Sequence, residues 1–153
     1  MYEHILIPTD GSELSRKAIE HGIALARSVN AKVTVMTVTA PFHVFAVEPG
    51  MVTDTPEQYE KHAANLAAKD LSAATEVAKA AGISCDTMRV EHEHAYRAII
   101  DTAAQKICDL IVMASHGRRG ISAIVLGSET VKVLTHSAVP VLVVRARPPS
   151  FAS

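Results

Sequence analysis

Short apolar runs alternate along this chain with longer segments in which apolar residues recur at helical spacing. The runs are rich in β-branched residues and predict five strands, at 5–7, 32–39, 84–91, 109–114 and 140–145. The run at 109–114 is apolar at almost every position, as expected for a strand that is covered on both faces. The pattern therefore predicts a sheet with a buried centre.

Helices are predicted between the strands, and the first two carry recognisable end signals. Ser12 can cap the first helix, and Asn30 ends it. Thr55 is followed by proline and, three residues after the cap, by Gln58, which together predict the start of the second helix. Gly82 is a natural stop for that helix.

Two further helices complete the alternation. A fourth helix is expected from about Gly127 to His136, and the third is predicted from one apolar stripe. That stripe consists of Tyr96, Ile99, Ile100, Ala103 and Ile107. Prolines and a glycine interrupt the pattern at 40–55, so we expect a long loop there.

The order of these elements, strand and helix in strict alternation, predicts a single α/β domain. Such a chain requires a mostly parallel sheet with right-handed crossovers and helices on both faces. In sheets of this kind the ligand site lies beyond the carboxyl ends of the strands, where the strand order reverses. The loops of interest are therefore Pro8–Ser12, after the first strand, and Ala114–Ser128, after the fourth.

Composition excludes several classes of function for this chain of 153 residues. Aromatic residues make up only 4% and tryptophan is absent, which argues against a base-stacking surface for nucleic acid. A net charge of -1 argues against broad attraction to DNA or to an anionic membrane surface. Two cysteines do not make a disulfide framework, and no apolar run approaches the roughly 18 residues of a membrane span.

The N-terminus leads straight into the first strand without a recognisable leader, so we expect a cytoplasmic protein with reduced cysteines. Acidic residues outnumber basic ones up to residue 107, and basic residues outnumber acidic ones beyond it. The last third of the chain is therefore the part that tolerates an anion best.

Candidate chemistry is concentrated in the two loops. Gly127 and Ser128 open a helix, and the N–H groups of a helix N-terminus attract anions. Ser128 could instead serve only as the helix cap. Arg118 lies beside Arg119 in the same loop, where both could meet a polyphosphate or simply be solvated. Asp10 could hold a ribose hydroxyl, an amino group or, indirectly, magnesium, or could merely begin an Asp-Gly turn.

Other signatures are missing or incomplete. Neither G-x-x-x-x-G-K-[ST] nor a G-x-G-x-x-G after the first strand is present, so spacing alone predicts an anion or nucleotide site of no standard type. A hydrolase triad of Ser115, His116 and Asp10 is disfavoured because adjacent residues point apart and no G-x-S-x-G surrounds the serine. His92 and His94 could share a metal, but no third ligand is signalled by spacing.

The stretch from Met113 to Ser128, MASHGRRGISAIVLGS, resembles the signature of the universal stress protein family. The ATP-binding branch of that family carries G-x2-G-x9-G-[ST]. Here nine residues separate Gly117 from Gly127, Ser128 follows, and Ala114 replaces the first glycine. The opening ILIPTDGS and the closing VPVLVVR also resemble the first and last strands of this family.

The resemblance implies a fold and a domain. It implies a five-stranded parallel sheet of order 3-2-1-4-5, open and Rossmann-like, of the adenine nucleotide alpha hydrolase-like type. We expect the universal stress protein domain to span residues 1–147 and to be followed by a flexible tail at 148–153.

The resemblance also implies binding residues. The adenosine end of a nucleotide would contact the first loop and the end of the second strand, at Pro8, Thr9, Asp10 and Val38. The ribose and phosphates would contact Met113, Ala114, Gly117, Gly127, Ser128, Glu129 and Thr130, with Arg118 beside them. The implied ligand is ATP, or AMP or ADP in its place, with magnesium.

Two hypotheses about function follow. In the first, the protein is an ATP-binding module of stress response or signalling, with at most slow hydrolysis, because no residue is placed as a convincing base for an attacking water. In the second, it is a member that binds no nucleotide and acts through a protein partner. In either case the apolar last strand would be an exposed edge, so we expect a homodimer through Val141 and Val143, with further assembly open.

Overall fold

The computed structural model describes residues 1–42, 55–117 and 126–146, and it has the alternating architecture that the pattern predicts. The strands are β1 (His4–Pro8), β2 (Lys32–Thr39), β3 (Cys85–Glu91), β4 (Leu110–Ala114) and β5 (Val141–Val144). The helices are α1 (Glu13–Val29), α3 (Pro56–Ala81), α4 (Ala95–Gln105) and α5 (Ser128–His136).

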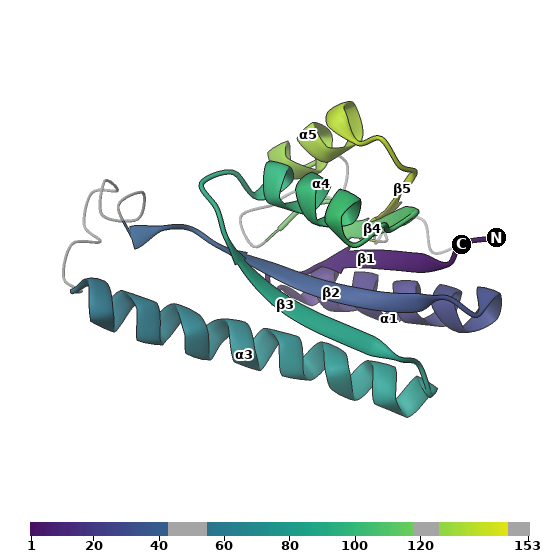
Figure 1. The fold of residues 1–153 in the computed structure, drawn as a ribbon, viewed down its shortest axis with the longest axis horizontal. Helices are drawn as coiled ribbons and strands as arrows, with labels where there is room; N and C mark the ends of the chain where they lie inside the picture. The colour runs from purple at the N-terminus through teal and green to yellow at the C-terminus, as the bar shows by residue number, and fades with distance from the viewer. Residues whose placement is uncertain (43–54, 118–125, 147–153) are drawn as a thin grey trace, which may run out of the picture.

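All strand pairs are parallel, and the sheet order is β3-β2-β1-β4-β5, as the family resemblance implied. Figure 1 shows α1 and α3 on one face of the sheet and α4 and α5 on the other. The chain reverses its direction of travel across the sheet between β1 and β4. The carboxyl ends of these two central strands are therefore the switch point of the fold.

The two larger apolar clusters among the described residues lie one on each face of the sheet and hold the layers together. Alternate strand residues such as Ile5, Ile7 and Val112 pack with Ile23 of α1 and with Ala74 and Ala78 of α3. The intervening strand residues, among them Leu6, Met36, Ile111 and Met113, pack with Ile99 of α4 and Val133 of α5. This division between the faces follows from the two-residue period of a strand.

Local sequence sets the ends of α1 and α3 in the predicted way. The Ser12 hydroxyl accepts a hydrogen bond from the Ser15 N–H, at 3.2 Å, and Asn30 ends α1 in the left-handed conformation at φ 59°. Thr55 and Gln58 form a capping box, with bonds of 3.1 and 3.0 Å. Gly82 ends α3 at φ 71°. The predicted boundaries of these two helices are confirmed.

The prediction that Ile107 belongs to the apolar stripe of α4 is wrong. The helix ends at Gln105, and Ile107 takes a left-handed φ of 55° with its side chain 83% exposed. This turn lets the Cys108 N–H bond to the Ala103 carbonyl at 2.8 Å and brings the cysteine into the core instead.

Most of the predicted loop at 40–55 lies outside the described residues, as does the tail from residue 147. The first residues of the 40–55 segment contact α3: the Tyr59 hydroxyl donates a hydrogen bond to the Ala40 carbonyl, and the Phe42 ring packs against the Tyr59 ring. Among the described residues, no helix is both long and apolar enough to cross a membrane.

Candidate functional site

A cavity of about 550 Å³ lies at the switch point, between the carboxyl ends of β1 and β4 and the first turns of α4 and α5. Its volume is in the ordinary range for a small-molecule site. Every predicted binding residue within the described part of the chain lines it: Pro8, Thr9, Asp10, Val38, Met113, Ala114, Gly117, Gly127, Ser128, Glu129 and Thr130. Arg118 and Arg119 lie outside the described residues.

The loop after β1 is fixed by its own hydrogen bonds. The Thr9 hydroxyl is buried, lies 3.0 Å from the Ser15 hydroxyl and accepts a bond from the Gly11 N–H at 3.2 Å. The Asp10 carboxylate accepts a bond from the Ser12 N–H at 2.9 Å, and Gly11 supplies the φ of 79° that the turn requires. The predicted Asp-Gly turn is therefore present, and it presents the Asp10 carboxylate to the cavity.

The two loops meet at Asp10 and Gly117. A Cβ atom added to Gly117 would lie 2.5 Å from the Asp10 Oδ2, which is closer than such atoms approach. A side chain at this position would displace the Asp10 carboxylate, so the glycine leaves room for that carboxylate. This contact explains in steric terms why a glycine stands at position 117.

The N-terminus of α5 opens into the cavity. Gly127 is the N-cap and contributes no side-chain bond, so the alternative in which the Ser128 hydroxyl is only a cap is wrong. The first N–H groups of a helix have no partner within it, and here no side chain at the cap position takes their place. The first turn of α5 therefore presents donors and positive dipole to the space in front of it.

Backbone bonds hold this helix start against the end of β4. The Gly127 N–H bonds to the Ser115 carbonyl at 2.7 Å, and the Thr130 hydroxyl donates to the Ala114 carbonyl at 2.9 Å. A Cβ atom on Gly127 would lie 3.1 Å from the Cα atom of His116, so the glycine permits this close approach.

Glu129 is held toward α4. Its Oε2 accepts a bond from the Tyr96 N–H at 2.9 Å, and its Oε1 lies 3.7 Å from the Lys132 Nζ. The N-cap of α4, His94, makes no side-chain cap bond, so the carboxylate of Glu129 supplies that cap from a different helix. Glu129 is also one of the residues that line the cavity.

One part of the cavity wall is apolar. Val38 at the end of β2, Met113 at the end of β4 and Ile99 of α4 lie there with Pro8 and Ala114. The cavity therefore combines an apolar wall, suited to a flat ring, with a helix N-terminus, suited to an anion.

Four lining residues were not predicted as site residues: Ser15, Ala95, Ile99 and His116. Ala95 opens the helix after β3, whose carboxyl end lies at the same edge of the sheet as that of β1. The position of Ala95 just after β3 could therefore have predicted it as a site residue. Ile99 was predicted only as a core residue, and the Thr9–Ser15 contact depends on a turn geometry that spacing does not give.

The geometry of Ser115 and His116 also argues against a hydrolase triad. The Ser115 hydroxyl lies 3.3 Å from the Nδ1 of His116, but the serine is 1% exposed and does not line the cavity. A nucleophile must reach its substrate, and this side chain is buried.

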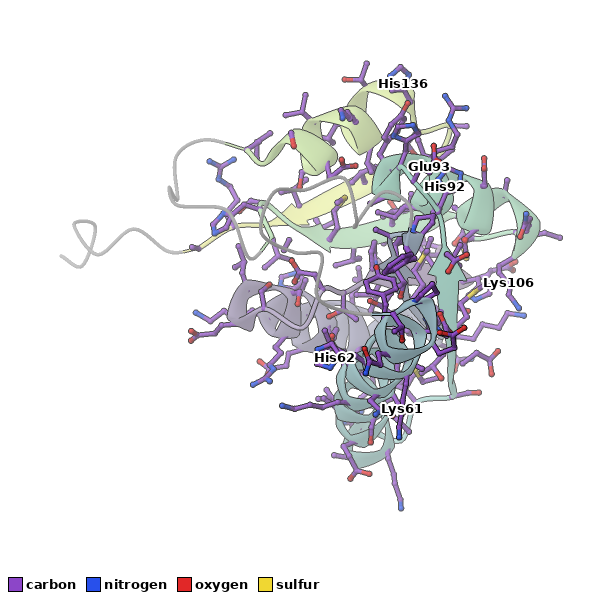
Figure 2. The ribbon with its side chains drawn as sticks, turned by 90° about the vertical axis from the view of Figure 1, so that its left-hand side faces the viewer. Lys61, His62, His92, Glu93, Lys106 and His136 are labelled. Atoms are coloured by element: carbon purple, nitrogen blue, oxygen red, sulfur yellow. The ribbon has the colours of Figure 1, made fainter. Side chains whose placement is uncertain are left out.

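His92 and His94 lie in a row of rings on the surface. His94 packs toward Tyr96, and Tyr96 toward His136, with ring centroids 6.2 and 5.6 Å apart. Figure 2 shows His92 and His136 on the same side of the molecule. No group of three or more potential metal ligands is found among the described residues.

An open, doubly wound parallel sheet with a cavity and a helix N-terminus at its switch point defines the class: an α/β protein with a ligand site at the topological switch. The profile of the universal stress protein family matches residues 1–145. The chain belongs to this family.

Two relatives agree with that assignment. Universal stress protein MJ0531 of Methanocaldococcus jannaschii is 32% identical over 148 residues, covering 95% of this chain and 83% of the relative. Universal stress protein YxiE of Bacillus subtilis is 30% identical over 149 residues, covering 95% of this chain and 100% of the relative.

Solved structures share the fold. The hypothetical protein MJ0577 matches with a TM-score of 0.80 and 26% identity, covering 96% of this chain and 98% of its own. A universal stress protein in complex with cAMP matches with a TM-score of 0.69 and 24% identity, covering 95% and 98%. One from Archaeoglobus fulgidus in complex with dAMP has a TM-score of 0.64 and 19% identity, covering 94% and 98%.

Proposed function

We propose that this chain binds an adenine nucleotide, ATP, in the switch-point cavity and acts as a nucleotide-dependent module of stress response. The observation that carries the proposal is the start of α5, whose N-cap has no side-chain bond and which opens into a 550 Å³ cavity with an apolar wall. The complexes of two fold relatives with cAMP and dAMP support an adenine nucleotide as the ligand class.

The residues divide between the parts of a nucleotide. Val38 and Pro8 offer apolar contact for the base, and Asp10 offers a carboxylate for ribose hydroxyls. The N–H groups of the first turn of α5 and the Ser128 hydroxyl offer donors for phosphate oxygens. Magnesium would be held mainly by the phosphates, since this ion keeps several waters and seldom uses an all-protein cage.

We propose binding and sensing with at most slow hydrolysis. The titratable side chains that line the cavity within the described ranges are Asp10, His116 and Glu129. Asp10 holds the Ser12 N–H and Glu129 holds the Tyr96 N–H, so both carboxylates are engaged in building the site. A general base has to be poised toward an attacking water, and this arrangement favours holding a ligand over turning it over.

We further propose a homodimer across β5, which lies at the end of the sheet order. The carbonyls of Pro140 and Val144 accept bonds from β4, so by strand alternation the backbone groups of Val141 and Val143 face the outer edge. Cys85 and Cys108 are free thiols, which fits the reducing cytoplasm as the place of action.

The test of nucleotide binding is the Ser128→Asp variant. Aspartate in the first turn of a helix favours folding, so the protein should remain folded while a negative charge enters the anion site. We expect the affinity for Mg-ATP, measured by calorimetric titration after any bound nucleotide has been stripped, to fall by about tenfold or more.

The matched control is Ser72→Asp, which makes the same change at an exposed position of α3, away from the lining residues. It should bind Mg-ATP like the unmodified protein. If the unmodified protein releases no nucleotide on denaturation and gives no heat with Mg-ATP, AMP or cAMP, the proposal fails. The protein would then be examined as a partner-binding member of the family.

A further inference from the structure

The phosphate end of the cavity carries a fixed negative charge. Glu129 stands in the first turn of α5, beside Ser128, and lines the cavity. A carboxylate in a first helical turn competes with an external anion for the same N–H groups and the same dipole. The arrangement is therefore not a purely electropositive phosphate cradle.

Two contacts keep this carboxylate in place. The Tyr96 N–H, in the first turn of α4, donates to Oε2 at 2.9 Å, and the Lys132 Nζ lies 3.7 Å from Oε1. The Lys132 Nζ also lies 5.4 Å from the centroid of the Tyr96 ring. Because the cap of α4 depends on this carboxylate, moving it away from the Tyr96 N–H would leave the helix start without its side-chain acceptor.

The bond between Glu129 and the Tyr96 N–H also occupies the N-terminus of α4. Ala95, at the start of α4, lines the cavity, so two helix N-termini approach it. Glu129 already serves one of them. Phosphates bound at the start of α5, as proposed, would share the first turn of that helix with Glu129.

We propose that Glu129 is a specificity-determining residue that sets how much negative charge the cavity accepts. The inference rests on the proposed nucleotide binding and goes beyond it by naming the feature of the ligand that is selected. Glu129 penalises highly charged nucleotides relative to those with one phosphate, and a divalent cation on the phosphates relieves the penalty.

Electrostatics gives an order of effects. AMP carries about two negative charges and metal-free ATP about four, while bound magnesium returns ATP to about two. Removing one like charge from the wall should therefore help metal-free ATP most, and Mg-ATP and AMP much less. For a partly exposed carboxylate we expect a gain of about fivefold for metal-free ATP over AMP.

The test is Glu129→Gln in the full chain. Glutamine keeps an oxygen that can accept the Tyr96 N–H, so the cap of α4 is retained while the charge is lost. Dissociation constants are measured for AMP, for ATP with EDTA and for ATP with magnesium. Glu76→Gln, an exposed position on α3, makes the same change in net charge away from the cavity.

We expect Glu129→Gln to raise the affinity for metal-free ATP over AMP about fivefold, and Glu76→Gln to leave the ratio unchanged. An equal change for all three ligands, or no change, overturns the role of Glu129 while nucleotide binding stands. If neither the unmodified protein nor Glu129→Gln binds any of the three, the proposed function fails and this inference fails with it.

Discussion

Ile107 is the most unusual residue of the described backbone. It is β-branched, has a φ of 55° and leaves its side chain 83% exposed. A left-handed conformation costs an L-residue about 1–2 kcal/mol, and only glycine and asparagine adopt it readily. Asn30 ends α1 at φ 59° and is a suitable residue for that role, whereas Ile107 takes the same conformation without that advantage.

Replacing Ile107 by glycine should stabilise the protein. The substitution removes the backbone penalty and loses little burial, so we expect the free energy of unfolding to rise by about 1 kcal/mol. Thermal or urea unfolding measures this change. Ile107→Val is the control, since it retains the branched Cβ and should leave the stability near its original value. If Ile107→Gly were less stable than the original protein, the claim that the conformation of Ile107 costs stability would be wrong.

At the scale of single residues, the sequence predicts what neighbours along the chain decide. Asn30, Thr55 and Gly82 end or begin helices through bonds within a few residues, and all three were predictable. The cap that Glu129 provides for α4 joins residues far apart in the sequence. No local pattern contains that contact, which arises only when the two helices are packed side by side.

At the scale of elements, His4 connects the start of β1 to two neighbours. Its Nδ1 lies 3.0 Å from the Lys106 carbonyl, just after α4, and its Nε2 lies 2.7 Å from the Thr34 hydroxyl of β2. A carbonyl can only accept, so Nδ1 carries the proton and Nε2 accepts from the hydroxyl. The neutral ring thus completes a buried junction between three elements.

Burial lowers the pKa of His4, although the bond to the Lys106 carbonyl opposes the shift. A histidine whose pKa is lower in the folded state than in the unfolded state contributes stability above its unfolded pKa of about 6.5. That contribution is lost as the pH falls from about 6.5 through the folded pKa. We expect the urea midpoint to decrease over this window.

The variant His4→Gln checks this origin, because it cannot titrate. Its urea midpoint should be lower at neutral pH but should vary less between pH 7.5 and 5 than that of the original protein. The control is His62→Gln, at an exposed position on α3 that Figure 2 labels, which should keep the original pH dependence. An unchanged slope in His4→Gln would assign the acid sensitivity to other groups.

The Asp109 carboxylate affects the stability of the protein in a lower pH range than His4 does. Burial tends to raise its pKa, but the bonds from the N–H groups of Glu3 and His4 outweigh this, and the pKa is lowered. Stability from this group is therefore present above its unfolded pKa of about 3.9 and is lost as the pH falls further. The pH range separates it from the effect of His4.

The elements themselves were largely predictable, and their arrangement was less so. Periodicity gives five strands and four helices because each strand alternates its faces and each helix has one apolar side. The strand order depends on which long-range pairings form, and here it came from the resemblance to a family. Of the cavity residues on α4, Ala95 was missed although the crossover after β3 gave a signal for it, and Ile99 was predicted only as a core residue.

At the scale of the whole molecule, the edge of the sheet at β5 is where we expect a second copy of the chain to bind. A strand with unpaired backbone groups is a ready template for another strand. Val143→Pro removes one N–H that faces this edge, and proline is tolerated in edge strands. We expect a dimer for the original protein and a monomer for Val143→Pro by analytical ultracentrifugation, with far-UV circular dichroism unchanged. A monomeric original protein would contradict the proposed dimer.

The bond between the Gly127 N–H and the Ser115 carbonyl has a consequence for how this protein can diversify. It fastens the two ends of the intervening segment to each other and to the sheet. The entropy of closing a loop grows only slowly with its length, by about 0.6 kcal/mol for each doubling. Closure entropy alone therefore does not explain the nine-residue spacing between Gly117 and Gly127, and side-chain exchanges within that spacing are the changes that leave the floor of the cavity in place.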